Sequence, residues 1–239
     1  MKLKFNGCHL FPLLGLIVLA FLSNRSGFDQ WASALFYDSA LQGFAWRDTP
    51  ILSGLMHTGL KNLSVAIWIV GLLILLLTRA RPQLLPATWS LHLSSHQVAV
   101  TYMLLSALFA SLLVAWLKSL SAHSCPWDLS EFGGQFSFFL LGQSPDAAAV
   151  IKGLGPGQCF PSGHASVGWM WMGAFFLPAL YRGMNGPASA RLVRLLQLAV
   201  ILLGLTVSVV QVVRGAHFPS HVIATASVCW SVSWLCLCM

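Results

Sequence analysis

The sequence predicts an all-α membrane protein, a single domain over residues 1–239 with six transmembrane helices in one bundle. Hydrophobic residues make up 57% of the chain and charged residues only 8%, whereas a soluble domain carries about 25% charged residues. Uncharged runs also recur at close to the roughly 20 residues that cross a hydrocarbon core of about 30 Å. These two observations exclude a soluble globular domain and a disordered chain.

Six runs contain no Asp, Glu, Lys or Arg. They cover residues 8–24, 62–78, 98–117, 165–181, 195–213 and 219–239. Lys2 and Lys4 precede the first run as in a signal peptide, but no convincing small-residue cleavage site follows it. We therefore expect the first run to be a retained signal-anchor helix.

The basic residues predict the orientation, because short cytoplasmic loops are enriched in Lys and Arg. With the N-terminus inside, all six acidic residues fall on the outer side. The cytoplasmic side then carries Lys2, Lys4, Arg79, Arg81, Arg182, Arg191 and Arg194. We expect a cytoplasmic N-terminus, and we interpret the net charge of +7 as a topological signal rather than a nucleic-acid-binding surface.

Two outer segments are too long to be simple turns. In the first, residues 25–61, the apolar spacing of Phe28, Trp31, Ala32, Leu35 and Phe36 is typical of an amphipathic helix. We expect this helix on the membrane surface, either as an anchor or as the wall of a path for lipid. The second segment, residues 118–164, is rich in Gly, Pro and Ser and forms a long outer loop before the fourth span; such loops are usually functional.

Side chains that could take part in catalysis or bind an anion gather at the outer ends of the third to sixth spans. Lys118 closes the third span, Pro161-Ser162-Gly163-His164 opens the fourth, and Arg214-Gly215-Ala216-His217 joins the fifth to the sixth. His221 follows one turn into the last span. Backbone N–H groups at a helix start bind anions such as phosphate, Lys118 and Arg214 add positive charge, and two histidines offer a nucleophile and a proton donor. Phosphoryl transfer needs this combination.

The ordered set Lys, Pro-Ser-Gly-His and Gly-x-His-x-Pro-Ser resembles the three-part signature of the type 2 phosphatidic acid phosphatase superfamily, the membrane lipid phosphate phosphatases. That signature is Lys-x6-Arg-Pro, Pro-Ser-Gly-His and Ser-Arg-x5-His-x3-Asp. The likeness covers residues 118–221 and departs from the pattern at Cys125, Gln211 and His221, where the family has Arg, Arg and Asp. Cys-Pro-Trp-Asp-Leu and Arg-Gly-Ala-His-Phe-Pro-Ser-His look similar to a bacterial branch near the lipid A phosphatases.

The resemblance implies an integral membrane phosphatase that acts through a phosphohistidine, with no metal ion and no cofactor. His217 would be the nucleophile and His164 the proton donor. Phosphate would be bound by Lys118, Arg214 and the backbone around Ser162 and Gly163, with His221 as a supporting partner that could accept a hydrogen bond from His217.

The partners implied are a phosphorylated lipid substrate and membrane lipids, and the oligomeric state stays open. Lipid A, undecaprenyl pyrophosphate, phosphatidylglycerol phosphate and phosphatidic acid are candidate substrates. We expect the site on the periplasmic face of a bacterial inner membrane. His57 and Lys61, four residues apart at the outer end of the second span, could touch the head group.

Cys125 and Cys159 are expected to form a disulfide. Both lie in the second outer segment, whereas Cys8 lies near the cytoplasmic start and the other three cysteines lie in the last span. An oxidising periplasm permits such a bond, which would hold the Lys118 segment against the Pro-Ser-Gly-His turn.

Two alternatives remain from the sequence. A lipid phosphotransferase would use the same phosphohistidine but pass the phosphate to another lipid. An inactive relative would bind a phosphorylated lipid without cleaving it, which the changes at Gln211 and His221 would permit. A secondary transporter is disfavoured, because the spans show no paired broken helices and no repeat.

Overall fold

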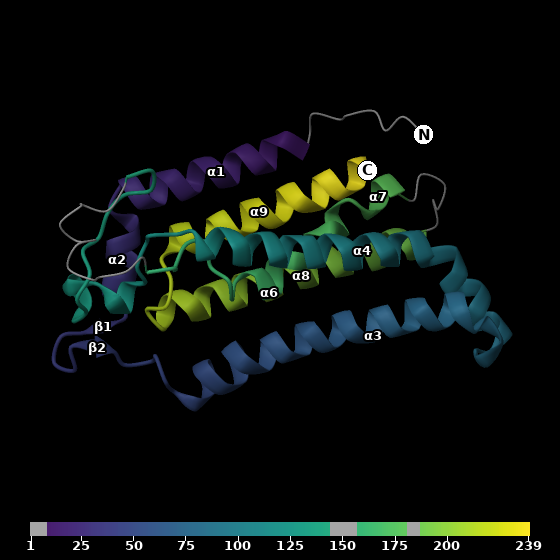
Figure 1. The fold of residues 1–239 in the computed structure, drawn as a ribbon, viewed down its shortest axis with the longest axis horizontal. Coiled ribbons are helices and arrows are strands. Elements are labelled where there is room, and N and C mark those ends of the chain that lie inside the picture. Colours follow the sequence, from purple (N-terminus) through teal and green to yellow (C-terminus); the bar gives the residue numbers. More distant parts are fainter. Residues whose placement is uncertain (1–8, 144–156, 181–186) are drawn as a thin grey trace.

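The structure, a computed structural model, describes residues 9–143, 157–180 and 187–239 and is mostly helical (Figure 1). Its long helices are α1 (Leu10–Arg25), α3 (Leu60–Ala80), α4 (Ala87–Ser119), α8 (Pro187–Val213) and α9 (Pro219–Cys238). Its shorter helices are α2 (Phe28–Ala34), the π-helix η2 (Pro50–Gly59), η3 (Pro82–Leu84), η4 (Pro126–Asp128), η5 (Ser130–Phe132), α6 (Ser166–Trp169), η6 (Met170–Phe175) and α7 (Leu177–Leu180). Strands β1 (Tyr37–Asp38) and β2 (Gly43–Phe44) form a small antiparallel hairpin.

Four helices in the described ranges are long and apolar enough to cross a membrane. They are Pro50–Ala80, Ser95–Ser119, Ala190–Val213 and Pro219–Cys238. α1 and α2 together form a further candidate bent by 70°, so the described chain supports four or up to five spans. The predicted count of six is therefore only partly supported.

The predicted fourth span, residues 165–181, differs most from expectation. Its described part, Ser166–Leu180, is a shorter apolar segment that divides into α6, η6 and α7, with glycines at 168 and 173 that favour the helix poorly. Much of it is enclosed by the other helices rather than exposed. Tyr181 at its end, like Cys8 at the start of the first run, lies outside the described residues.

The second predicted span also has different bounds. Its helical segment begins at Pro50 rather than at residue 62, because the π-helix η2 continues directly into α3. His57 therefore lies inside a helix and not in a loop before it.

Successive long segments run in opposite directions along the bundle, with α1 against α9 and α3 at one side (Figure 1). This alternation gathers α2, the β1–β2 hairpin, the ends of α4 and α8 and the starts of α3 and α9 at one end of the molecule, which we call the motif end. Arg79, Arg191 and Arg194 lie near the other end, on the last turn of α3 and the first turns of α8. Lys2, Lys4, Asp146, Lys152 and Arg182 lie outside the described residues.

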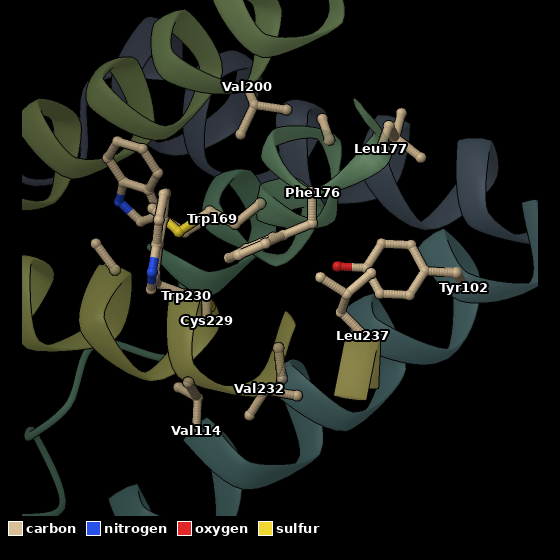
Figure 2. Packing of buried hydrophobic residues seen from close by; sticks show 14 of the residues in the cluster. Tyr102, Val114, Trp169, Phe176, Leu177, Val200, Cys229, Trp230, Val232 and Leu237 are labelled. Carbon is tan, nitrogen blue, oxygen red and sulfur yellow. The ribbon is translucent and has the colours of Figure 1, made fainter. Parts of the chain in front are cut away.

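The core of the bundle is built around the short central helices. Phe176 and Trp230 pack with ring centroids 5.0 Å apart, and Phe176 is fully buried (Figure 2). Trp169 lies over Gly204 of α8, where a Cβ would meet the indole at 2.5 Å. Because helix association in a membrane depends on close packing, this contact at Gly204 lets α6 approach α8 and fixes the turn that precedes α6.

α2 follows α1 at the predicted position of the surface helix. Phe28, Trp31 and Leu35 beside it are exposed, whereas Asp29 and Ser33 are completely buried. The apolar face is thus directed outward and the buried face is polar and small, an arrangement that fits contact with lipid but does not by itself place the helix on a membrane surface.

Candidate functional site

The end of α8 sets the position of His217. Gly215 donates its N–H to the carbonyl of Val212 and Ala216 donates to that of Gln211, which is the Schellman pattern of a helix terminus. Gly215 has a φ of +68°, and a Cβ there would collide with the Phe44 ring at 2.3 Å, so glycine is required. His217 also donates its backbone N–H to the Gln211 carbonyl.

The start of α9 is held by a carboxylate from α2. Asp29 accepts hydrogen bonds from the backbone N–H and the hydroxyl of Ser220, and also from the side chains of Ser23 and Asn24. Pro219 occupies the first helical position and the N-cap residue Phe218 offers no side-chain cap, so Asp29 caps the helix from another element. His217 and His221 flank this capped turn.

The Pro-Ser-Gly-His turn lies against the end of α4. A Cβ at position 163 would lie 3.7 Å from the Nζ of Lys118, which places the ammonium group directly beside the turn. Ser162 caps Ala165 with its hydroxyl and donates its own N–H to the carbonyl of His221. The N–H of Ser162 is therefore already paired, whereas the N–H groups of Gly163 and His164 have no acceptor among the described residues and are the ones left in this turn for an anion.

Cys125 and Cys159 form a disulfide, with their Cα atoms 5.2 Å apart. The Sγ of Cys159 lies 3.3 Å from the Nδ1 of His217. The backbone of Cys159 also affects the protonation of both His217 and His221, and it raises the pKa of His217 against the larger effect of burial. The disulfide therefore contacts the predicted nucleophile as well as closing the loop.

His221 does not hydrogen-bond to His217 in the structure. The two ring centroids are 5.8 Å apart in an edge-on arrangement, and the Cys159 backbone affects the protonation of both rings. His221 Nδ1 is buried and has no partner among the described residues. His123 lies beyond it, with ring centroids 6.3 Å apart.

His57 joins the site from η2. Its ring stacks on that of His164 with centroids 3.6 Å apart and an interplanar angle of 22°. Its Nδ1 accepts hydrogen bonds from the Nη1 of Arg214 at 2.7 Å and from the Nε2 of Gln211 at 3.0 Å. Arg214 also donates its Nε to the carbonyl of Arg47 at 2.7 Å. The sequence indicated His57 only as a head-group contact and gave no signal for this bonding, which depends on the packing of η2 against α8.

Burial and positive neighbours keep both proposed catalytic rings neutral. Burial, followed by the charges of His57, Lys118, Lys61 and Arg214, lowers the pKa of His164 to about 3. Burial also lowers the pKa of His217 well below its usual value, followed by the charges of His221, Lys118 and His164. Lys118 thus acts on both histidines.

The structure brings together all the sequence-predicted site residues, Lys118, Ser162, Gly163, His164, Arg214, His217 and His221, with the disulfide of Cys125 and Cys159 beside them. The donor atoms of Cys125, Cys159 and His217 lie within 4.8 Å of one another, but the two sulfurs are bonded to each other. Because a metal ion is bound by thiolates and these two cysteines form a disulfide, the three residues do not make up a set of metal ligands. Asp128, which belongs to the same outer segment, accepts a hydrogen bond from Trp127.

The fold and the site define a helical protein with membrane-length helices and with histidines and cations gathered at one end. The sequence pattern of the PAP2 superfamily matches residues 99–239, more than half of the chain, and the protein belongs to that superfamily. Its members are generally phosphatases that act on phosphate esters. No curated protein and no solved structure matches the chain.

Proposed function

We propose that the protein is an integral membrane phosphatase that hydrolyses a phosphate monoester or pyrophosphate on a lipid through a phosphohistidine intermediate. The observation that carries this proposal is the convergence of His217, His164, Lys118 and Arg214 at the motif end. A neutral nucleophile, a nearby imidazole and two cations form a complete set for phosphoryl transfer without a bound metal.

In the first step, His217 attacks the phosphorus in line and the bond from phosphorus to the lipid oxygen breaks. Because Nδ1 of His217 faces Cys159, Nε2 is the nitrogen that forms the N–P bond. His164 gives its proton to the departing lipid oxygen. Lys118, Arg214 and the N–H groups of Gly163 and His164 bind the equatorial oxygens, where charge gathers in the transition state.

In the second step, water attacks the phosphohistidine and the N–P bond breaks. His164, now neutral, accepts a proton from that water and passes it to the departing phosphate, so the ring is neutral again in the free protein. Inorganic phosphate leaves and His217 regains its lone pair. The two steps use the same pair of rings in opposite directions, as reversibility of acid–base catalysis requires.

The lipid assignment rests on the surroundings of the site. Apolar side chains cover the outer faces of α1 and α3, so the motif end lies where these helices would leave a membrane and meet head groups. The disulfide beside His217 fits an oxidising compartment. We therefore place the site on the periplasmic face of a bacterial inner membrane, with a cytoplasmic N-terminus.

The test is phosphate release by the detergent-solubilised protein from phosphatidic acid, phosphatidylglycerol phosphate, undecaprenyl pyrophosphate and lipid A. We expect release from at least one lipid, an acid-labile phosphoprotein on rapid quenching, and loss of both in His217→Ala. More than about a tenth of the wild-type rate in His217→Ala, a loss below about 1.4 kcal/mol, would contradict the phosphohistidine. Transfer of labelled phosphate to an added lipid instead of water would identify a phosphotransferase.

A further inference from the structure

We propose that His57 is a positioning residue of the active site, which holds the Arg214 guanidinium with its Nδ1 and supports the His164 ring with its face. The inference rests on the proposed function and adds to it a residue outside the three sequence motifs. His57 comes from the π-helix η2, whereas the motifs lie on α4, the turn before α6 and the α8–α9 connection.

The hydrogen bonds of His57 identify its tautomer. A guanidinium group only donates, so the Nδ1 that receives Arg214 Nη1 at 2.7 Å carries a lone pair. Gln211 Nε2 donates to the same atom at 3.0 Å. A neutral His57 therefore carries its proton on Nε2. A proton on Nδ1 would remove the bond from Arg214, which can only donate, so this contact favours the neutral ring.

The bond to His57 also sets how Arg214 can meet a phosphate. Arginine has five N–H donors, of which one binds the Arg47 carbonyl and one binds His57. The remaining three are left for an anion. Held at two points, the guanidinium does not have to be ordered again when substrate binds, which is the benefit of a pre-organised site.

Stacking of the His57 ring on His164 affects the proposed proton donor. The two rings lie 3.6 Å apart and nearly parallel, which restricts the orientation of His164. When His164 is protonated, its positive charge is attracted to the face of a neutral aromatic ring. A second imidazolium in the same place would repel it. Keeping His57 neutral therefore helps His164 to carry its proton. The other charged groups that act on His57 are Lys61 and Lys118.

The contact with His57 also gives Gln211 a role in positioning. Gln211 stands where the superfamily pattern has arginine and is 1% exposed. Its Nε2 and Arg214 Nη1 converge on His57 Nδ1, one turn of α8 apart. His57 thus links the substituted position to the arginine proposed to replace it.

Two substitutions separate the two contacts. His57→Phe keeps an aromatic ring for the stack but removes the acceptor; we expect KM to rise about tenfold with a smaller change in kcat. His57→Asn keeps a polar acceptor but removes the ring; we expect kcat to fall about tenfold, as when acid catalysis is impaired, and the high-pH limb of the kcat profile to move to lower pH. His9→Asn is the matched control at the far end of the bundle and should behave as wild type.

Each variant is measured with the best lipid of the four named above, and its thermal unfolding midpoint is recorded in the same detergent. Wild-type kcat, KM and pH profile in both His57 variants, beside an inactive His217→Ala, would overturn the positioning role and leave the proposed phosphatase intact. Equal losses in both variants with no shift of the pH profile would also overturn it, since a purely structural role predicts that pattern.

A second measurement needs no substrate. Nitrogen-15 NMR of histidine-labelled protein, with His57 assigned by the loss of its signals in His57→Asn, should show an unprotonated Nδ1 and a protonated Nε2 near neutral pH. A proton on Nδ1 would overturn the inference. If wild type releases phosphate from none of the four lipids, the proposed function fails, and the spectrum still decides whether His57 holds Arg214 as described.

Discussion

Cys159 lies directly against His217. Its Sγ is 3.3 Å from His217 Nδ1, and its backbone raises the pKa of the same histidine against the larger effect of burial. The residue is completely buried and bonded to Cys125. The covalent loop closure and the orientation of the proposed nucleophile therefore depend on one residue.

Opening the disulfide should impair catalysis more than binding. We expect Cys125→Ser, or treatment with a dithiol reductant, to lower kcat several-fold while KM changes little, because Cys159 loses its tether and His217 its fixed orientation. The unfolding midpoint should also fall, since closing a loop with a sequence separation of 34 is worth about 4 kcal/mol in the chain-entropy model.

Phosphate release and thermal unfolding in detergent check this prediction, with Cys229→Ser as a control at a free buried cysteine. The prediction would be contradicted by full activity in a sample whose Cys125–Cys159 disulfide is shown by alkylation and mass spectrometry to be reduced.

His221→Ala tests whether the second histidine positions His217. The two rings meet edge-on with centroids 5.8 Å apart, so we expect loss of His221 to lower kcat and to leave KM nearly unchanged. The loss should be smaller than that in His217→Ala. Activity within about threefold of wild type, or about 0.65 kcal/mol, would show that Cys159 orients His217 without help from His221. Kinetics at saturating and limiting substrate distinguish these outcomes.

Asp29 should matter for folding more than for chemistry. Asp29→Ala removes the cap of α9 and leaves buried donors of Ser23, Asn24 and Ser220 without their acceptor. The expected cost is about 3 kcal/mol, seen as a lower unfolding midpoint. Asp48→Asn is the matched control, because that side chain is 83% exposed and should change the midpoint little. A midpoint in Asp29→Ala equal to that of Asp48→Asn would contradict the capping role.

The sequence predicted that the candidate site residues lie at one end of the bundle, because helix direction decides where they fall. Once the apolar runs alternate in direction, Lys118, the turn at 161–164 and His217 must fall at one end, whatever the details of packing. The pairing of Cys125 with Cys159 follows in the same way, since both belong to one outer segment. These predictions needed only the order of elements along the chain.

The remaining contacts depend on tertiary packing and could not be predicted. The apolar run at 165–181 predicts a spanning helix, but close packing of Gly168 and Trp169 against Gly204 places it inside the bundle as three short pieces. His57 reaches Arg214 only because η2 extends the second span toward the motif end. The contact of Cys159 Sγ with His217 Nδ1 joins residues 58 positions apart in the chain, which no residue pattern marks.

The pH dependence of kcat/KM tests the source of the catalytic proton. Burial lowers the pKa of His164 to about 3 and that of His217 well below its usual value, so both rings are neutral in the free protein between about pH 5 and 8. His217 is then ready to attack, but His164 lacks the proton that it must give to the lipid oxygen. A substrate monoanion would bring that proton, and the dianion formed in the site would stabilise it on His164.

We therefore expect kcat/KM for a lipid monoester to be level at mildly acid pH and to fall as pH rises through the second phosphate pKa, about 6. On the acid side it should not fall near pH 6.5, because His217 does not gain a proton there. The high-pH limb of kcat should lie above that of kcat/KM, since bound phosphate raises the pKa of His164 in the complex. Initial rates from pH 4.5 to 9 with phosphatidic acid give both profiles. A kcat/KM that increases with pH through 6.5 would show instead that His217 titrates at its ordinary value and that burial does not set its charge.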